Sequence, residues 1–192
     1  MAVDGAWENL LEVQAFKFRD RLAYSWHEQG EIKAGISFSD LLKTSDLIAA
    51  RLQSQFKPGE RIALIFGPGL DFIEAFFGCT RAGLVPVPLS PSLGRHQFAP
   101  ILPILINCQA AAVLGPELLW KRQQSHAKSA EQIHDFIWLN WASVKAEAQD
   151  LMAVRQPVSQ GDIAFLQYTS GSTGNPRGVI VGHANVLHNL QQ

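Results

Sequence analysis

The chain lacks the features that mark several large classes of protein. It contains no uninterrupted run of about 18 apolar residues, which is the length that a membrane-spanning helix requires. Its formal net charge is only -1, and no stripe of Lys and Arg marks a surface for nucleic acid. The N-terminal segment has no basic residues followed by an apolar run, so it does not look like a secretory signal. We therefore expect a soluble, cytoplasmic protein that neither spans a membrane nor binds nucleic acid.

Cysteine is scarce, and the histidines are not clustered with other metal ligands. The two cysteines, Cys79 and Cys108, lack CxxC spacing, so we expect buried thiols of a reducing compartment rather than a disulfide or a zinc site. Four of the six histidines lie in separate polar contexts with no cysteine or carboxylate at ligand spacing, namely His27, His96, His126 and His134. His183 and His188 are five residues apart and do not share a helical face, which argues against a metal pair.

Short apolar runs alternate with amphipathic segments along the chain. We expect strands at residues 22–26, 61–66, 84–89, 111–114 and 136–139, and helices at residues 10–18, 70–83, 97–106, 117–128 and 144–151. This alternation is typical of an α/β fold, a layered domain with a largely parallel sheet flanked by helices, in one compact unit. Ligands of such sheets bind at loops beyond the strand ends, and the loop from Tyr168 to Arg177 is expected to be such a place.

A further helix is predicted by its capping signal. Ser37, followed three residues later by Asp40, indicates a helix N-terminus. The face of this helix that we expect to be buried carries Leu41, Ser45, Ile48 and Leu52.

Two groups of aromatic residues have spacings that favour packing over ligand binding. Phe72, Phe76 and Phe77 could line an acyl channel, but residues at helical spacing are more often part of a core. The segment that contains Trp138 and Trp141 is interpreted in the same way.

One loop has the composition of a phosphate-binding site. Residues 165–183 read FLQYTSGSTGNPRGVIVGH, with a glycine- and hydroxyl-rich loop between two runs of strand-forming residues. Gly171, Gly174 and Gly178 lack a Cβ atom, which lets backbone N–H groups approach an anion closely. Hydroxyl groups donate to phosphate oxygens or join the shell of a magnesium ion, and Arg177 adds a permanent charge with forked donors. The expected phosphate contacts are Thr169, Ser170, Gly171, Ser172, Thr173, Gly174 and Arg177.

The same loop is not a P-loop, and its residues supply no catalytic side chain. The Walker pattern needs a second glycine followed by Lys and Ser or Thr, whereas Pro176 and Arg177 stand at those positions after Gly171. For an SGSTG string alone, a solvent-exposed turn between two strands is the alternative. None of the loop residues is a nucleophile or a general base, and His183 is expected to lie near the loop.

The segment from Tyr168 to Gly178, YTSGSTGNPRG, resembles the phosphate-binding signature of the adenylate-forming superfamily, whose enzymes join ATP to a carboxylate. The lead-in of Gln167 and Tyr168, the SGS core and the VLHNL segment at 186–190 resemble the fatty acyl-AMP ligase branch more than the acyl-CoA synthetases. Two positions depart from the family pattern. Arg177 stands where the family usually has Lys, and Gly182 stands where it commonly has Ser.

Two upstream segments are similar to the same branch. Residues 66–96 resemble the family's early helix and proline-rich turn, including Arg95 and His96, and residues 36–52 resemble its first motif region. The resemblance starts near Arg21 and reaches the C-terminus, while residues 115–160 are unspecific. It implies that residues 1–192 are the N-terminal portion of an AMP-binding domain, truncated after the phosphate-binding loop.

The resemblance also implies a reaction for the complete enzyme. A fatty acid carboxylate attacks the α-phosphate of ATP in the presence of Mg²⁺, and the acyl group passes from the adenylate to an acyl carrier protein or a polyketide or peptide synthase module. The loop would hold the β- and γ-phosphates. In the family the nucleoside contacts, the acidic magnesium ligand and a catalytic lysine lie downstream, so the chain alone is expected to be inactive. An acyl-CoA synthetase, an amino-acid-adenylating enzyme and a non-catalytic interaction module of the same fold remain as alternatives.

Overall fold

The computed structural model describes residues 9–91, 101–119, 121, 136–148, 152–154, 156–169 and 176–190. The elements follow in the order α1 (Asn9–Lys17), β1 (Leu22–Glu28), β2 (Glu31–Ser37), α2 (Phe38–Gln53), β3 (Arg61–Ile65), α3 (Leu70–Arg81), β4 (Val85–Leu89), α4 (Leu102–Asn107), β5 (Ala110–Gly115), β6 (Ile137–Asn140), α6 (Trp141–Glu147), β7 (Ile163–Thr169), β8 (Arg177–Gly182) and α7 (His183–Leu190). In this part of the chain, no helix has the length and apolar character needed to cross a membrane.

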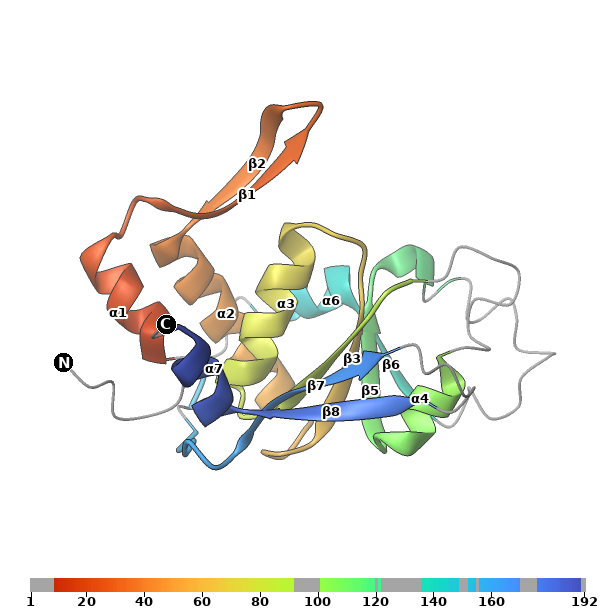
Figure 1. Ribbon diagram of the computed structural model, residues 1–192. Helices are drawn as coiled ribbons and strands as arrows, with labels where there is room; N and C mark the ends of the chain where they lie inside the picture. Colours follow the sequence, from red (N-terminus) through yellow and green to blue (C-terminus); the bar gives the residue numbers. More distant parts are fainter. Residues whose placement is uncertain are drawn as a thin grey trace.

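Four parallel strands form the central sheet in the order β4-β3-β5-β6 (Figure 1). Strand β3 lies between β4 and β5, with Ile62 opposite Pro86 on one side and Ala112 on the other. Strand β4 forms an edge of this sheet, which suits Pro86 and Pro88 because proline has no N–H to donate to a second neighbour. The predicted parallel α/β architecture is confirmed.

Helices cover both faces of this sheet. Ile62 and Leu64 of β3 pack into a cluster with α2, α3 and α6, whereas Ala63 and Ile65 pack into a second cluster with α4. All four side chains are completely buried. Burial on both faces explains why β3 is a continuous apolar run rather than an alternating one.

The expected buried face of α2 is confirmed, and so is its N-terminal cap. Its four predicted residues, from Leu41 to Leu52, are at most 1% exposed. Ser37 has an extended backbone, and its Oγ accepts a hydrogen bond from the backbone N–H of Asp40 at 3.1 Å. The same hydroxyl donates to the Asp40 carboxylate at 2.6 Å.

We expect Ser37→Ala to lower the free energy of unfolding by about 1 kcal/mol, because the helix loses the acceptor for one of its unsatisfied N–H groups. Urea denaturation followed by circular dichroism measures this change. Ser37→Thr keeps a hydroxyl at the same position and is the matched control. Equal stability of the Ala and Thr variants would show that the cap contributes nothing.

Helix α6 begins earlier than the sequence pattern predicts. We expected a helix at residues 144–151, but α6 starts at Trp141, because Asn140 caps it by accepting from the backbone N–H of Ala142 at 3.0 Å. Trp141 is 4% exposed, and its ring packs edge-on against Phe66. The expectation that this tryptophan packs in the core is confirmed.

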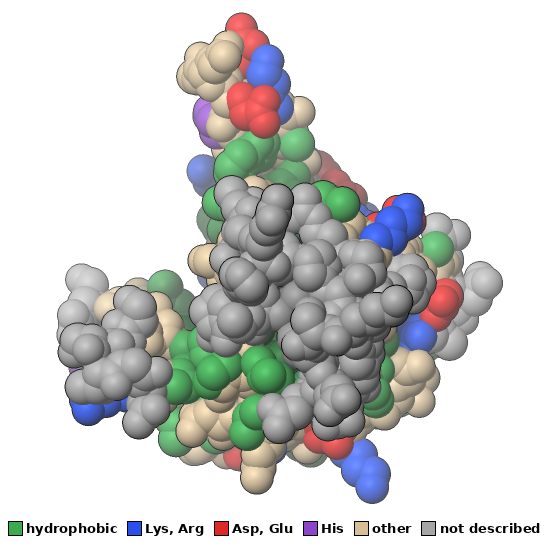
Figure 2. Space-filling view, turned by 90° about the vertical axis from the view of Figure 1, so that its right-hand side faces the viewer, with side chains coloured by type: hydrophobic (Ala, Val, Ile, Leu, Met, Phe, Trp, Pro, Cys, Tyr) green, Lys and Arg blue, Asp and Glu red, His purple; other side chains and the backbone are tan. Residues whose placement is uncertain are grey.

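The β1–β2 hairpin projects away from the rest of the molecule (Figure 1). Its turn contains Gln29 and Gly30 with φ angles of 51° and 83°. The tip is charged, as Figure 2 shows, and carries the ion pair of Lys33 with Glu31 at 2.6 Å. Such a tip is suited to solvent rather than to the core.

A third apolar cluster joins the remaining helices to β7. It contains Leu11 of α1, Phe77 of α3, Ala164 of β7 and Leu187 of α7. The expectation that the phenylalanines of α3 are core residues is confirmed by Phe77, which is 8% exposed. This cluster therefore holds the last part of the described chain on the α/β body.

Both cysteines are free and buried, as expected. Cys79 belongs to the cluster between the sheet and α3, and burial raises the pKa of its thiol far above the ordinary value. A thiol of this kind is chemically inert because the thiolate is the reactive form.

Candidate functional site

The glycine- and hydroxyl-rich loop joins β7 to β8, which pair as an antiparallel hairpin separate from the parallel sheet. The alternation of helices and strands placed this loop beyond the end of a parallel strand, and that placement is wrong. Strand β8 instead runs antiparallel beside β7 (Figure 1). Only residues 170–176 separate the two strands, which is too short a connection for parallel neighbours, because these need a long crossover.

Two of the seven expected phosphate contacts lie in the described part of the chain, and they lie opposite each other. Thr169 ends β7, Arg177 begins β8, and the two are register partners at the mouth of the loop. Directly opposite residues of an antiparallel pair project to the same face. The hydroxyl and the guanidinium therefore emerge together from one face of the hairpin. Outside the described residues lie Ser170, Gly171, Ser172, Thr173 and Gly174.

Arg177 is available to an external anion. Its side chain is exposed, and it forms no ion pair with the carboxylates of the described residues. A guanidinium stays charged at any pH that a folded protein meets and presents forked donors to phosphate oxygens. The mouth of the loop thus offers one cationic and one neutral donor.

Gly178 has a packing role that the sequence pattern did not indicate. A Cβ built at this position would lie 2.8 Å from Cζ of Tyr168. The two residues are register partners in the hairpin. Glycine is needed here because the Tyr168 ring lies across the backbone of β8.

Tyr168 also links the hairpin to helix α4. Its hydroxyl donates a hydrogen bond to Oδ1 of Asn107, the last residue of α4. Burial raises the pKa of the phenol, and the nearby Cys108 thiol adds a smaller increase, so the hydroxyl is protonated at neutral pH and remains a donor. No motif in the sequence marks Asn107, which is 61 positions away from Tyr168.

The end of α4 is itself tied to the central sheet. Arg61, the first residue of β3, donates from Nε to the backbone oxygen of Cys108 at 2.8 Å. Its Nη2 donates to Oε1 of Gln109 at 2.9 Å. Gln109 has a φ of 50°, a conformation that lets the chain reverse into β5. Asn107 therefore directly precedes a turn that is fixed to the central sheet by the hydrogen bonds of Arg61.

His183 does not lie near the loop. It is 3% exposed and begins α7, at the end of β8 opposite to Arg177. Its backbone N–H donates to the oxygen of Asp162 at 3.1 Å, near the start of β7. A strand of six residues spans about 20 Å, so the expected proximity is wrong.

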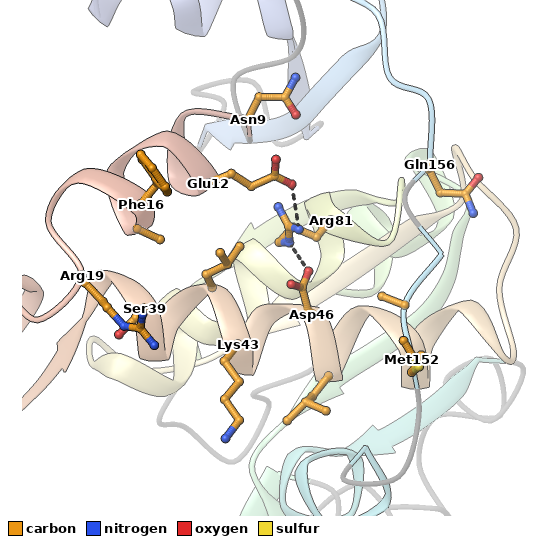
Figure 3. A pocket seen from close by; sticks show the side chains of 14 residues that line it. Asn9, Glu12, Phe16, Arg19, Ser39, Lys43, Asp46, Arg81, Met152 and Gln156 are labelled. Carbon is orange, nitrogen blue, oxygen red and sulfur yellow. Dashed lines mark hydrogen bonds and ion pairs between the residues drawn. The ribbon is translucent and has the colours of Figure 1, made fainter.

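A pocket of about 880 Å³ lies elsewhere, between α1, α2 and residues 152–156 (Figure 3). Arg81 lies inside it and pairs with Glu12 at 3.1 Å and with Asp46. These two carboxylates already neutralise the arginine. None of the described residues of the segment, which are 168, 169 and 176–178, lines this pocket, so it is separate from the described part of the candidate phosphate site.

The other residues singled out from the sequence are Arg95, His96 and the phenylalanines of α3. Arg95 and His96 lie outside the described residues. Phe72 and Phe76 pack against the core with their ring centroids 5.9 Å apart, which confirms the packing interpretation. Among the described residues, no three histidine, cysteine or acidic side chains gather as metal ligands would.

Comparison with known proteins relates this chain to adenylating enzymes. Residues 11–192 match the family described as AMP-binding enzyme. The medium-chain-fatty-acid–[acyl-carrier-protein] ligase JamA of Moorena producens is 33% identical over 186 residues, which cover 94% of this chain and 31% of the relative. The long-chain-fatty-acid–AMP ligase FadD26 of Mycobacterium tuberculosis is 31% identical over 199 residues, covering 98% of this chain and 33% of the relative.

A solved structure shows the same arrangement. The fatty acyl-adenylate ligase of L. pneumophila, in complex with acyl adenylate and pyrophosphate, superposes with a TM-score of 0.83 at 28% identity, over 97% of this chain and 32% of that chain. The present chain thus spans about a third of the length of these relatives. The family match extends the resemblance upstream of Arg21 and through residues 115–160. This chain belongs to the AMP-binding enzyme family.

Proposed function

We propose that this chain carries the phosphate-binding part of a fatty acyl-AMP ligase. The observation that carries the proposal is the position of Thr169 and Arg177, which face each other at the mouth of the loop. The relatives support the choice of substrate, because JamA and FadD26 are named as ligases of fatty acids. The related ligase of L. pneumophila binds acyl adenylate and pyrophosphate.

The role of the loop follows from the charge that develops in the reaction. When a carboxylate oxygen attacks the α-phosphorus of ATP, the bond from that phosphorus to the bridging oxygen breaks and pyrophosphate leaves. Negative charge accumulates on the departing group, and donors that are already oriented stabilise it without reorganisation. The proposed donors are Thr169, Ser170, Gly171, Ser172, Thr173, Gly174 and Arg177. They act by positioning and neutralising the phosphates.

Magnesium fits this donor set. Mg²⁺ prefers oxygen ligands and, when bound, would share the neutralisation of the phosphate charge. Thr169 offers a hydroxyl oxygen of this kind. For the whole protein, we propose that the acyl group is then transferred to an acyl carrier protein or synthase module in the cytoplasm.

Magnesium-ATP should raise the melting temperature of the 192-residue chain. A ligand present at 100 times its Kd stabilises the folded state by about 2.7 kcal/mol, which corresponds to roughly 5–10 °C for a chain of this size. Differential scanning fluorimetry measures the shift, and magnesium-AMP, which lacks the β- and γ-phosphates, is the matched ligand control. A shift with AMP as large as that with ATP would contradict the assignment of the loop to those phosphates.

Catalysis is tested separately. We expect no fatty-acid-dependent exchange of pyrophosphate into ATP by the 192-residue chain, because it spans only about a third of the length of the ligases to which it is related. Robust exchange with any fatty acid would overturn this expectation. A chain that shows neither exchange nor an ATP-dependent shift would instead be an interaction module of the same fold.

A further inference from the structure

We propose that Tyr168 and Asn107 form a clasp that positions the mouth of the phosphate-binding loop. The inference rests on the proposed function of the loop and adds two positioning residues to it. Neither side chain would touch the phosphates. The clasp acts by holding the end of the β7–β8 hairpin against helix α4.

The pleat of the hairpin separates the clasp from the ligand-facing residues. Successive register pairs of an antiparallel sheet project to opposite faces. The pair of Tyr168 with Gly178 and the pair of Thr169 with Arg177 are successive, so they face opposite sides of the hairpin. The Tyr168 hydroxyl binds Asn107 on one face, which leaves the hydroxyl of Thr169 and the guanidinium of Arg177 free on the other.

Gly178 allows the ring to lie close to the backbone beside Arg177. A Cβ at this position would lie 3.0 Å from Oη and 3.1 Å from Cε2 of Tyr168, in addition to its short contact with Cζ. These atoms belong to a rigid ring whose hydroxyl is already bound to Asn107. Any side chain at position 178 would therefore push the ring away from its hydrogen-bond partner.

The two ends of the hairpin differ in how they are held. At the far end, Phe165 of β7 packs edge-on against Phe76 of α3 with a centroid distance of 5.7 Å, and Ala164 is completely buried. Further along, β8 is exposed, with Val179 at 51% and Ile180 at 65% exposure. A two-stranded hairpin is marginally stable by itself. The bond from Tyr168 to Asn107 adds a restraint directly beside the pair of Thr169 and Arg177.

The clasp reaches the central sheet through Arg61. This residue fixes the backbone oxygen of Cys108 and the side chain of Gln109, which directly follow Asn107. The path from β3 to the loop mouth therefore consists of hydrogen bonds and one aromatic ring. Such a support is what a binding loop needs if its donors are to be oriented before the ligand arrives.

The test uses Tyr168→Phe, Asn107→Ala and the double variant. Tyr168→Phe keeps the ring over Gly178 and removes only the hydroxyl. The chain has only two tyrosines, so Tyr24→Phe in β1 is the matched control. Amide hydrogen exchange of residues 168–178 is measured without ligand, the affinity for magnesium-pyrophosphate is measured by calorimetry, and the melting temperature is recorded for each variant.

We expect each single variant to speed exchange at the loop mouth and to weaken pyrophosphate binding by about three- to tenfold, the equivalent of one lost hydrogen bond. The double variant should show no further loss, because both substitutions break the same bond. Tyr24→Phe should leave exchange and affinity unchanged. A change in melting temperature without any change at residues 168–178 would identify the bond as merely structural and overturn the clasp.

The exchange measurement separates this proposal from the proposed function. If the wild-type chain binds no pyrophosphate, the function of the loop is wrong, while the exchange rates still decide whether the clasp restrains the hairpin. If the wild-type chain binds pyrophosphate and the Tyr168→Phe and Asn107→Ala variants bind it equally well, the clasp is wrong and the function stands.

Discussion

Arg177→Ala should weaken magnesium-pyrophosphate binding by about 10- to 100-fold. A hydrogen bond to a charged group contributes about 1.5–3 kcal/mol, which corresponds to this range of affinity. Arg177 is exposed and forms no ion pair with the described carboxylates, so its removal should leave the folded state intact. Isothermal titration calorimetry of the two chains measures the difference directly.

Two control variants separate charge from geometry. Arg21→Ala removes the same charge from an exposed arginine whose guanidinium lies over the Phe18 ring, and it should not change the affinity. Arg177→Lys retains the charge but loses the forked donors, so we expect an affinity between those of the wild type and the Ala variant. Equal losses with Arg21→Ala and Arg177→Ala would mean that only the overall charge of the chain matters.

Gly78→Ala should lower the free energy of unfolding by about 2 kcal/mol, although alanine is the better helix former by about 1 kcal/mol. Gly78 lies in α3 where that helix meets α2. An added Cβ would lie 2.4 Å from Cγ2 and 2.7 Å from Cβ of Ile48. The Ile48 Cβ is fixed to the backbone of α2, so the two helices must move apart to relieve the overlap. Urea denaturation followed by tryptophan fluorescence measures the change.

Gly67→Ala is the matched control for this substitution. Gly67 follows β3, its added Cβ would meet no atom within 4 Å, and its φ angle is not in the left-handed region. We expect a change within about 0.5 kcal/mol of the wild type. If Gly78→Ala were as stable as Gly67→Ala, the close contact of α2 with α3 would be wrong.

Features that depend on local periodicity could be predicted from the sequence. The buried face of α2, the continuous apolar run of β3 and the packing of the α3 phenylalanines all follow from spacing within one element. The capping signal of Ser37 is similarly local. In each case the order of neighbouring residues indicates which side of the element is buried.

Features that depend on distant contacts could not be predicted in this way. The hairpin of β7 and β8 looks the same in the sequence whether its strands join the parallel sheet or pair only with each other. His183 is close to Arg177 in the chain, but an extended strand carries it to the opposite end of the hairpin. A short sequence distance limits the separation of two residues without fixing it.

In the candidate site, too, local features could be predicted and distant contacts could not. The composition of the loop predicted phosphate binding, and Thr169 and Arg177 lie together at its mouth. Gly178 also makes room for the ring of Tyr168, which the loop composition did not indicate. The sequence did not predict a role for Asn107, because its contact is with a residue 61 positions away. Asparagine at the end of a helix does not by itself indicate a function.

The most direct test of the central claim is the hydrogen-exchange footprint of magnesium-pyrophosphate on the wild-type chain. The proposed function predicts that ligand binding slows exchange in residues 169–178 and leaves the pocket between α1 and α2 unaffected. Protection confined to that pocket, or no protection anywhere in the chain, would contradict the assignment of the loop between β7 and β8 as the phosphate site.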